Sequence, residues 1–124
     1  MVLDTSAVVA ILFDEPERRA FTEAIANDPV RVISAANLLE AAMLVEARRG
    51  EPAGRELDLL LHCAGVNTVA VDAEQVEMAR RAWRRYGKGN DPAGLNFGDC
   101  FAYALARCRG EPLLFKGNDF NPAA

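Results

Sequence analysis

Histidine and cysteine are scarce in this sequence, and their scarcity disfavours several kinds of catalytic and metal site. His62 is the only histidine. It follows an apolar stretch, so we expect it to pack or to lie at the surface rather than to serve Ser-His-Asp or Cys-His catalysis. The three cysteines, Cys63, Cys100 and Cys108, are odd in number and lack C-x-x-C spacing. A disulfide framework and a zinc site are therefore disfavoured, and a reducing cytoplasm is the expected compartment.

Long apolar runs, linkers and an excess of positive charge are also absent. No run approaches the roughly 20 apolar residues that cross a bilayer, and Asp4 interrupts any signal-peptide pattern. The 124 residues contain no repeat or linker, which predicts one domain over 1–124. Lys and Arg number 14 against 18 Asp and Glu, a net charge of -4. That balance, taken alone, argues against a nucleic-acid partner.

Short apolar runs alternate with longer segments of helical periodicity. The runs predict strands at residues 1–3, 30–33, 69–71 and 113–115. The longer segments predict helices at residues 5–13, 16–27, 34–49, 53–64, 73–86 and 97–109. Strands joined by such helices need crossover connections, so the predicted fold class is α/β, with a mainly parallel sheet between helices on both faces.

Capping residues mark several of the predicted helix starts. Thr5 or Ser6 is expected to cap the first helix. Asp72 and Gln75 have the spacing of a capping box, and Asn96 is expected to cap the last helix. A turn is predicted at residues 117–119.

Two carboxylates follow predicted strands, Asp4 after the first and Asp119 after the last. In parallel α/β sheets the functional site lies at the carboxyl ends of the strands. Each acid alone also fits a structural role, as a helix cap or in an Asx turn. Two further acids stand among apolar neighbours. Glu40 lies within an apolar helix, which predicts costly burial, and Asp99 is third after the Asn96 cap, where the positive helix end also favours an acid.

Taken together, these four acids predict a cation site. Clustered carboxylates repel, so they need a cation or retained protons. Oxygen ligands without Cys or His favour Mg²⁺ or Mn²⁺ over zinc. Such an ion supports in-line attack on phosphorus, the chemistry of nucleases and phosphatases.

A basic segment covers the end of the helix predicted at 73–86 and the residues just after it, and it includes two aromatic residues. Its five cations and its aromatics are Arg80, Arg81, Arg84, Arg85, Lys88, Trp83 and Tyr86. A solvated helix face with an aromatic packed on the core is the first interpretation, and a patch that grips phosphates is the second. The nearby Gly87-Lys88-Gly89 has neither the P-loop nor the dinucleotide spacing.

Three segments and the mid-chain helical glutamate together form a familiar pattern. The segments are V-L-D-T-S-A-V-V-A-I-L, L-N-F-G-D-C-F-A-Y-A-L-A and P-L-L-F-K-G-N-D-F. In this order and spacing they resemble the PIN-domain ribonucleases, and among them the VapC-type toxins of bacterial toxin–antitoxin pairs. The resemblance covers residues 1 to about 120. In that family a further segment and strand commonly follow the last aspartate, whereas only residues 120–124 follow Asp119 here.

The resemblance implies an α/β/α sandwich, usually dimeric, that cleaves RNA with Mg²⁺ or Mn²⁺ and is neutralised by a small antitoxin. Transfer RNA and ribosomal RNA are the candidate substrate classes. The implied metal-binding and catalytic acids are Asp4, Glu40, Asp99 and Asp119. Ser6 matches the hydroxyl that supports the first acid, and Asn118 borders the fourth.

Two other functions remain open from the sequence. A receiver-like phosphoacceptor module also gathers carboxylates and Mg²⁺ at strand ends, and Lys116 could stand for its lysine. A catalytically idle binding module would keep RNA or antitoxin affinity without cleavage. The acidic balance does not exclude a nuclease, because removing the four acids from the 18 leaves as many acids as the 14 Lys and Arg.

Overall fold

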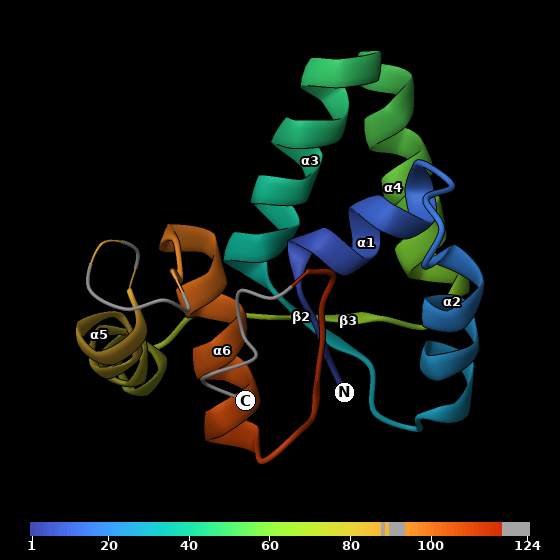
Figure 1. Ribbon diagram of the computed structural model, residues 1–124. Coiled ribbons are helices and arrows are strands. Elements are labelled where there is room, and N and C mark those ends of the chain that lie inside the picture. The colour runs from blue at the N-terminus through green and yellow to red at the C-terminus, as the bar shows by residue number, and fades with distance from the viewer. Residues whose placement is uncertain (88, 90–93, 118–124) are drawn as a thin grey trace.

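The computed structural model describes residues 1–87, 89 and 94–117, and in this part of the chain one parallel sheet is flanked by helices (Figure 1). The sheet has the order β3-β2-β1-β4, and every neighbouring pair is parallel. Its strands are β1 (Val2–Leu3), β2 (Val32–Ser34), β3 (Asn67–Val69) and β4 (Leu113–Leu114). The predicted α/β class with a parallel sheet is confirmed.

Six helices occur in the described residues. They are α1 (Thr5–Leu12), α2 (Arg18–Asn27), α3 (Ala35–Arg49), α4 (Glu51–Cys63), α5 (Ala73–Tyr86) and α6 (Phe97–Arg109). Most ends fall within about two residues of the predicted ones. None of these helices is both long and apolar enough to cross a membrane.

The alternation of side chains along the short strands creates the two apolar layers of the sandwich. Leu3 and Ile33 point to the face covered by α1, α3 and α4, where they join the largest buried cluster. Val2 and Val32 point to the opposite face and pack against Leu105 of α6. Because successive strand residues face opposite ways, two buried residues per strand are enough to bind helices to both faces.

Two strands begin two residues away from their predicted starts. β2 was predicted at 30–33 but runs Val32–Ser34, and its last residue also caps α3, since Ser34 Oγ accepts from Ala36 N–H at 3.3 Å. β3 was predicted at 69–71 but is Asn67–Val69, an edge strand whose first two side chains are exposed. Apolar composition marks strands covered on both faces, so it missed this partly polar one.

The capping predictions were fulfilled in part. Asp72 Oδ1 accepts from Gln75 N–H at 2.9 Å, but the Gln75 side chain donates to Ala70 O instead of closing the box. The complete box stands at the start of α6, where Asn96 and Asp99 exchange hydrogen bonds. That box holds Asp99 in place, so it belongs to the geometry of the site described next.

Candidate active site

A cavity of about 280 Å³ opens at the carboxyl ends of the strands and is lined by acids from three elements. Asp4 follows β1, Glu40 comes from α3 and Asp99 from the first turn of α6. Three of the four acids singled out in the sequence thus line one space. The other predicted residues, Asp119 and its neighbour Asn118, lie outside the described residues.

Asp4 is held by one carboxylate oxygen while the other has no partner among the described residues. Its Oδ2 accepts from Ser6 N–H at 3.0 Å and from Ser6 Oγ–H at 2.6 Å. Asp4 is therefore the cap of α1, and the prediction that Thr5 or Ser6 caps this helix was wrong. Oδ1 is buried without a hydrogen bond. Burial raises the pKa of this carboxyl, and the negative charge of Glu40 adds to the rise.

Ser6 connects Asp4 to the far edge of the sheet. Its hydroxyl donates to Asp4 and accepts from the backbone N–H of Lys116 at 2.9 Å. Because Lys116 follows β4 closely, one hydroxyl ties the ends of β1 and β4 together. The position of Ser6 beside the first acid fits the supporting role that the resemblance implies.

Asp99 serves as a capping residue and as a wall of the cavity. Its Oδ2 accepts from Asn96 N–H at 3.0 Å, and Asn96 Oδ1 accepts from Asp99 N–H at 2.9 Å. The side chain is buried, as its apolar neighbours predicted. The structural and the functional interpretations of this acid are therefore compatible, because capping fixes the carboxylate at the mouth of the cavity.

Glu40 is only half-buried, so its predicted burial holds in part. Leu39 and Met43, its apolar neighbours on α3, are 62% and 64% exposed, which leaves that side of the helix open to solvent. The Glu40 carboxylate lies over Gly98 of α6, at the place where any other residue would carry its Cβ.

Asn37 does not line the cavity but supports residues next to its acids, and sequence reasoning missed it. It is completely buried, and its Nδ2 donates to Thr5 Oγ1 at 3.2 Å and to Gly98 O at 3.0 Å. Thr5 Oγ1 in turn donates to Asn37 O. This side chain joins α1, α3 and α6 beside the three acids. An amide inside an apolar helix, one turn before Glu40, was the available signal.

Cations also line the cavity. Lys116 Nζ lies 2.8 Å from Glu15 Oε1 and 3.6 Å from Glu17 Oε1, and the hydrogen bond to Glu15 raises the pKa of the ammonium. Arg48 of α3 contributes a second positive charge, with its guanidinium 5.5 Å from the centre of the Phe13 ring. Positive charge at the rim of an acidic cavity suits a ligand that carries negative charge itself.

The side chains that line the cavity have the ligand chemistry of a site for a hard divalent cation, although they do not form a complete coordination site. In the described part of the chain, no three His, Cys, Asp or Glu side chains form a cluster with metal-binding geometry. The acids nevertheless offer only oxygen, and the buried Asp4 Oδ1 lacks any partner there. Oxygen ligands and a buried, unsatisfied carboxylate oxygen are features that suit Mg²⁺ or Mn²⁺.

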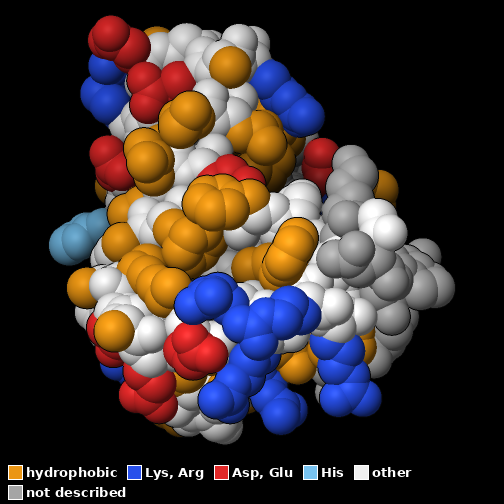
Figure 2. Space-filling model, turned by 90° about the vertical axis from the view of Figure 1, so that its left-hand side faces the viewer, with side chains coloured by type: hydrophobic (Ala, Val, Ile, Leu, Met, Phe, Trp, Pro, Cys, Tyr) orange, Lys and Arg blue, Asp and Glu red, His pale blue; other side chains and the backbone are white. Residues whose placement is uncertain are grey.

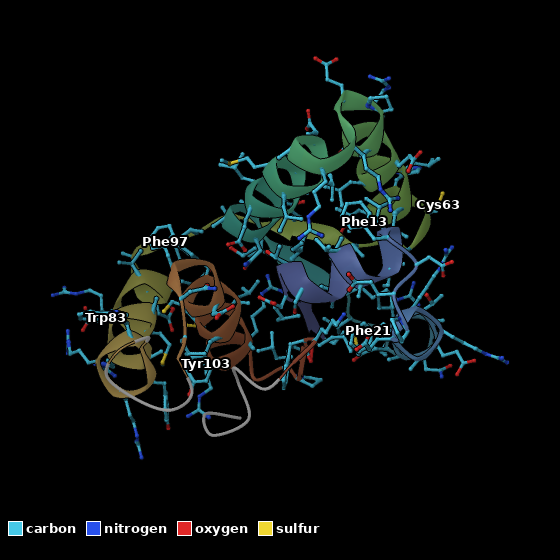
Figure 3. The ribbon with its side chains drawn as sticks, turned by 45° about the horizontal axis from the view of Figure 1, so that its top comes forward. Phe13, Phe21, Cys63, Trp83, Phe97 and Tyr103 are labelled. Atoms are coloured by element: carbon cyan, nitrogen blue, oxygen red, sulfur yellow. The ribbon has the colours of Figure 1, made fainter. Side chains whose placement is uncertain are left out.

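An exposed apolar surface adjoins the cavity on α3, α5 and α6. Two grooves of about 640 and 510 Å³ share Phe97 and Phe101, one reaching Trp83 and the other Met43. Figure 2 shows hydrophobic side chains gathered across this face, above a group of Lys and Arg. Phe97 is 82% exposed and Trp83 53%, and both lie on the α5 and α6 side of the molecule (Figure 3).

The basic segment is a solvated helix face only in part. Arg80 and Arg81 pair with Glu77 of the same helix, but Arg80 also lines the larger groove. Trp83 is 53% exposed, but the other aromatic of the segment packs on the core, as the first interpretation expects. Tyr86 is the aromatic that packs inward, edge-on to Tyr103 with ring centres 6.1 Å apart. Lys88 lies outside the described residues.

Comparison with known proteins gives consistent matches over the whole chain. A family model described as "PIN domain" matches residues 1–124. The chain is 62% identical over 120 residues to a "Ribonuclease VapC" of Mycolicibacterium smegmatis, covering 97% of this chain and 93% of that protein. It is 58% identical to "Ribonuclease VapC30" of Mycobacterium tuberculosis, with coverage of 97% and 92%.

Two solved structures share the fold at low sequence identity. VapC20 of Mycobacterium tuberculosis, described as a sarcin-ricin loop cleaving toxin, matches with a TM-score of 0.79 and 22% identity over 99% of this chain and 94% of its own. VapBC2 of Rickettsia felis, solved bound to a DNA fragment from the promoter, matches with a TM-score of 0.74 and 17% identity over 98% and 90%.

Because Asp4 is buried, replacing it with a neutral residue is predicted to change the stability of the protein in a pH-dependent way. A raised pKa means that the fold disfavours the ionised form, so this group contributes stability below its unfolded pKa near 3.8 and loses it as the pH rises. Asp4→Asn, measured by urea unfolding in EDTA, should be more stable than wild type at pH 7. The difference should shrink as the pH approaches 4.

The exposed Asp58 of α4 provides a matched control for this comparison. Asp58→Asn should show no comparable gain at pH 7. A gain for Asp4→Asn that is the same at pH 7 and pH 4 would contradict the assignment of that gain to buried charge.

Proposed function

The chain belongs to the PIN-domain family, and from this premise we propose that it is a metal-dependent endoribonuclease toxin. Relatives at 58% and 62% identity over nearly their whole length are VapC ribonucleases, which supports cleavage of RNA phosphodiester bonds. The observation that carries the proposal is the meeting of Asp4, Glu40 and Asp99 in one cavity, where one Asp4 oxygen has no partner among the described residues. Asp119 is proposed as the fourth acid.

In this proposal the acids hold Mg²⁺ or Mn²⁺, with each carboxylate oriented by its own element. A bound divalent ion acidifies water and stabilises the charge that develops on the attacked phosphate. Asp4 offers Oδ1 because Ser6 holds Oδ2. Asp99 is oriented by the α6 capping box. Such fixed orientation lowers the cost of assembling the reacting groups.

The cations of the rim have a separate role in the proposal. Arg48 lies on the same cavity as the acids and supplies positive charge where an RNA backbone would enter, whereas Lys116 is paired with Glu15 and Glu17. The net negative charge of the chain is then no obstacle, because the acids face the ion and the cations face the phosphates. Product ends of 5′-phosphate and 3′-hydroxyl are expected.

The receiver-like alternative has no support from the comparisons, which give ribonucleases along the whole chain. Its required lysine has another use here, since Lys116 pairs with Glu15 and Glu17. A receiver also needs a phosphoacceptor Asp after a middle strand. Asp72, which follows β3, caps α5 instead. The ribonuclease proposal accounts for the acids without these difficulties.

An antitoxin protein and an RNA substrate are the partners that we propose. A structural neighbour is a VapBC2 assembly, which supports a protein partner for this chain as well. Another neighbour is described as cleaving the sarcin-ricin loop, which keeps rRNA beside tRNA as a candidate substrate class. Both RNA classes would place the activity in the cytoplasm.

A second copy of the chain is the proposed occupant of the apolar surface on α3, α5 and α6. Phe97 forms an exposed ridge with an apolar groove on each side. A two-fold interface requires a patch that complements itself, and a ridge beside grooves meets that requirement. Exposed Leu39, Met43 and Trp83 extend the same surface.

Removing one acid should abolish cleavage without unfolding the chain. Asp99→Asn keeps an oxygen for the Asn96 N–H, and Glu40→Gln preserves shape, so both variants should fold. Each should cleave labelled RNA at least about 100-fold more slowly than wild type, since a lost ligand costs at least as much as a lost outer-shell partner. Excess EDTA should stop the wild type.

Glu46→Gln is the matched control, because Glu46 is exposed on the same helix as Glu40. It should cleave at the wild-type rate. Undiminished cleavage by Asp99→Asn or Glu40→Gln, or by wild type in EDTA, would contradict the metal mechanism.

The proposed antitoxin can be tested in the native host. A tagged copy of the chain should copurify with a smaller protein, and that protein added back at an equimolar ratio should stop RNA cleavage. Cleavage that no copurifying protein lowers would count against an antitoxin that acts on this site.

The proposed dimer predicts that a charge on the ridge yields monomers. Sedimentation analysis should give wild type twice the mass of one chain. Phe97→Asp should have the mass of one chain, because burying a carboxylate in an apolar interface is costly. Leu59→Asp, on an α4 residue that is 62% exposed but lines neither groove, should remain dimeric. A monomeric wild type would contradict the proposal.

A further inference from the structure

Gly98 occupies a place in α6 where a side chain has no room. A Cβ built there would lie 2.6 Å from Cδ of Glu40 and closer still to both carboxylate oxygens. Real Cβ contacts do not approach within 3.0 Å. The Glu40 carboxylate therefore occupies the space that glycine leaves empty, beside Asp99.

The backbone gives no other reason for glycine at this position. Gly98 is absent from the glycines with positive φ and lies in the first turn of a regular helix. Within helices glycine is less favourable than alanine. Since no turn or left-handed conformation requires it, the space for Glu40 is the physical reason that remains.

A second contact fixes the same peptide group to α3. Asn37 Nδ2 donates to Gly98 O at 3.0 Å, and Asn37 is completely buried. Asn37 and Glu40 are three residues apart, so they lie on one face of α3. One residue therefore anchors the Gly98 peptide while the other rests its carboxylate over the Gly98 Cα.

The helix end adds an electrostatic preference to this geometry. Gly98 is the second residue of α6, where backbone N–H groups give the helix its positive end. A carboxylate close to that end is favoured over one in open solvent. The space over Gly98 therefore favours one conformation of the long, flexible Glu40 side chain. The neighbouring side of α3, at Leu39 and Met43, is open to solvent.

We propose that Gly98 is a positioning residue whose missing side chain holds the Glu40 carboxylate beside Asp99 and thereby sets one acid of the metal site. The inference rests on the proposed function, because it concerns the binding of a divalent ion. In Gly98→Ala the added methyl displaces the far end of Glu40, a flexible side chain, so the fold survives while the acid moves. Gly98 acts only through Glu40.

The chain offers a matched control in Gly54. This glycine lies in α4 and faces a carboxylate of the same helix α3, with a Cβ placed 2.6 Å from Glu46 Oε2. Gly54→Ala therefore repeats the substitution, the helical setting and the displaced glutamate, but away from the cavity. Glu46 is exposed and can move into solvent.

The test is the affinity of the purified full chain for Mn²⁺, measured by calorimetric titration without RNA, together with thermal unfolding in EDTA. Gly98→Ala should bind Mn²⁺ at least about tenfold more weakly, the lower range for loss of an outer-shell contact. Its stability in EDTA should equal or exceed that of wild type. Gly54→Ala should bind Mn²⁺ as wild type does.

A double-mutant cycle separates positioning from general damage. In a Glu40→Ala background, Gly98→Ala should leave Mn²⁺ affinity unchanged, because the group it displaces is gone. If Gly98→Ala fails to fold, the Glu40→Ala/Gly98→Ala variant should fold, which would show that the overlap is with Glu40. Failure of both to fold would overturn the inference.

The outcomes distinguish this inference from the function on which it rests. A wild type that binds Mn²⁺ beside a Gly98→Ala variant that binds it equally well overturns the role of Gly98 alone. An equal loss in the Glu40→Ala background also overturns it, because Gly98 would then act through another group. A wild type that binds no Mn²⁺ overturns the proposed function and this inference together.

Discussion

The site depends on the different roles of the two oxygens of the Asp4 carboxylate. One oxygen begins α1 by accepting the Ser6 N–H and hydroxyl, and the other remains buried without a partner in the described residues. The cap fixes where the chain turns from β1 into α1, and the turn determines where the unpartnered oxygen points. Local structure and chemistry are thus set by the same side chain, which makes the acid costly to bury and hard to replace.

The remaining acids are held in relation to Asp4 by contacts between helices. Asn37 bridges Thr5, the residue after Asp4, and Gly98, the residue before Asp99. This buried amide links the chain neighbours of two acids that are 95 positions apart in the sequence. Its own Oδ1 has no partner in the described residues. Its Nδ2 makes both hydrogen bonds, and through them α3 is joined to α1 and to α6.

Sequence reasoning reached the class of fold and singled out three acids that the structure brings to one cavity, because both depend on local patterns. Buried strands are apolar, and acids at strand ends or among apolar neighbours stand out. It failed where a residue's role depends on a distant partner. The edge strand β3 is partly polar because one face has no cover, and Asn37 looks ordinary until α1 and α6 pack around it. Glu40 looked more buried than it is, since sequence does not reveal which apolar faces stay uncovered.

The first turn of α6 gives three consecutive residues three different directions. Phe97 points outward, Gly98 leaves a gap toward α3, and Asp99 points into the cavity. The gap is filled by the Glu40 carboxylate, so the residue at position 40 determines what a side chain at position 98 would cost. A descendant that lost the glutamate would be free to gain a side chain at 98. One that gained the side chain first would keep a displaced glutamate.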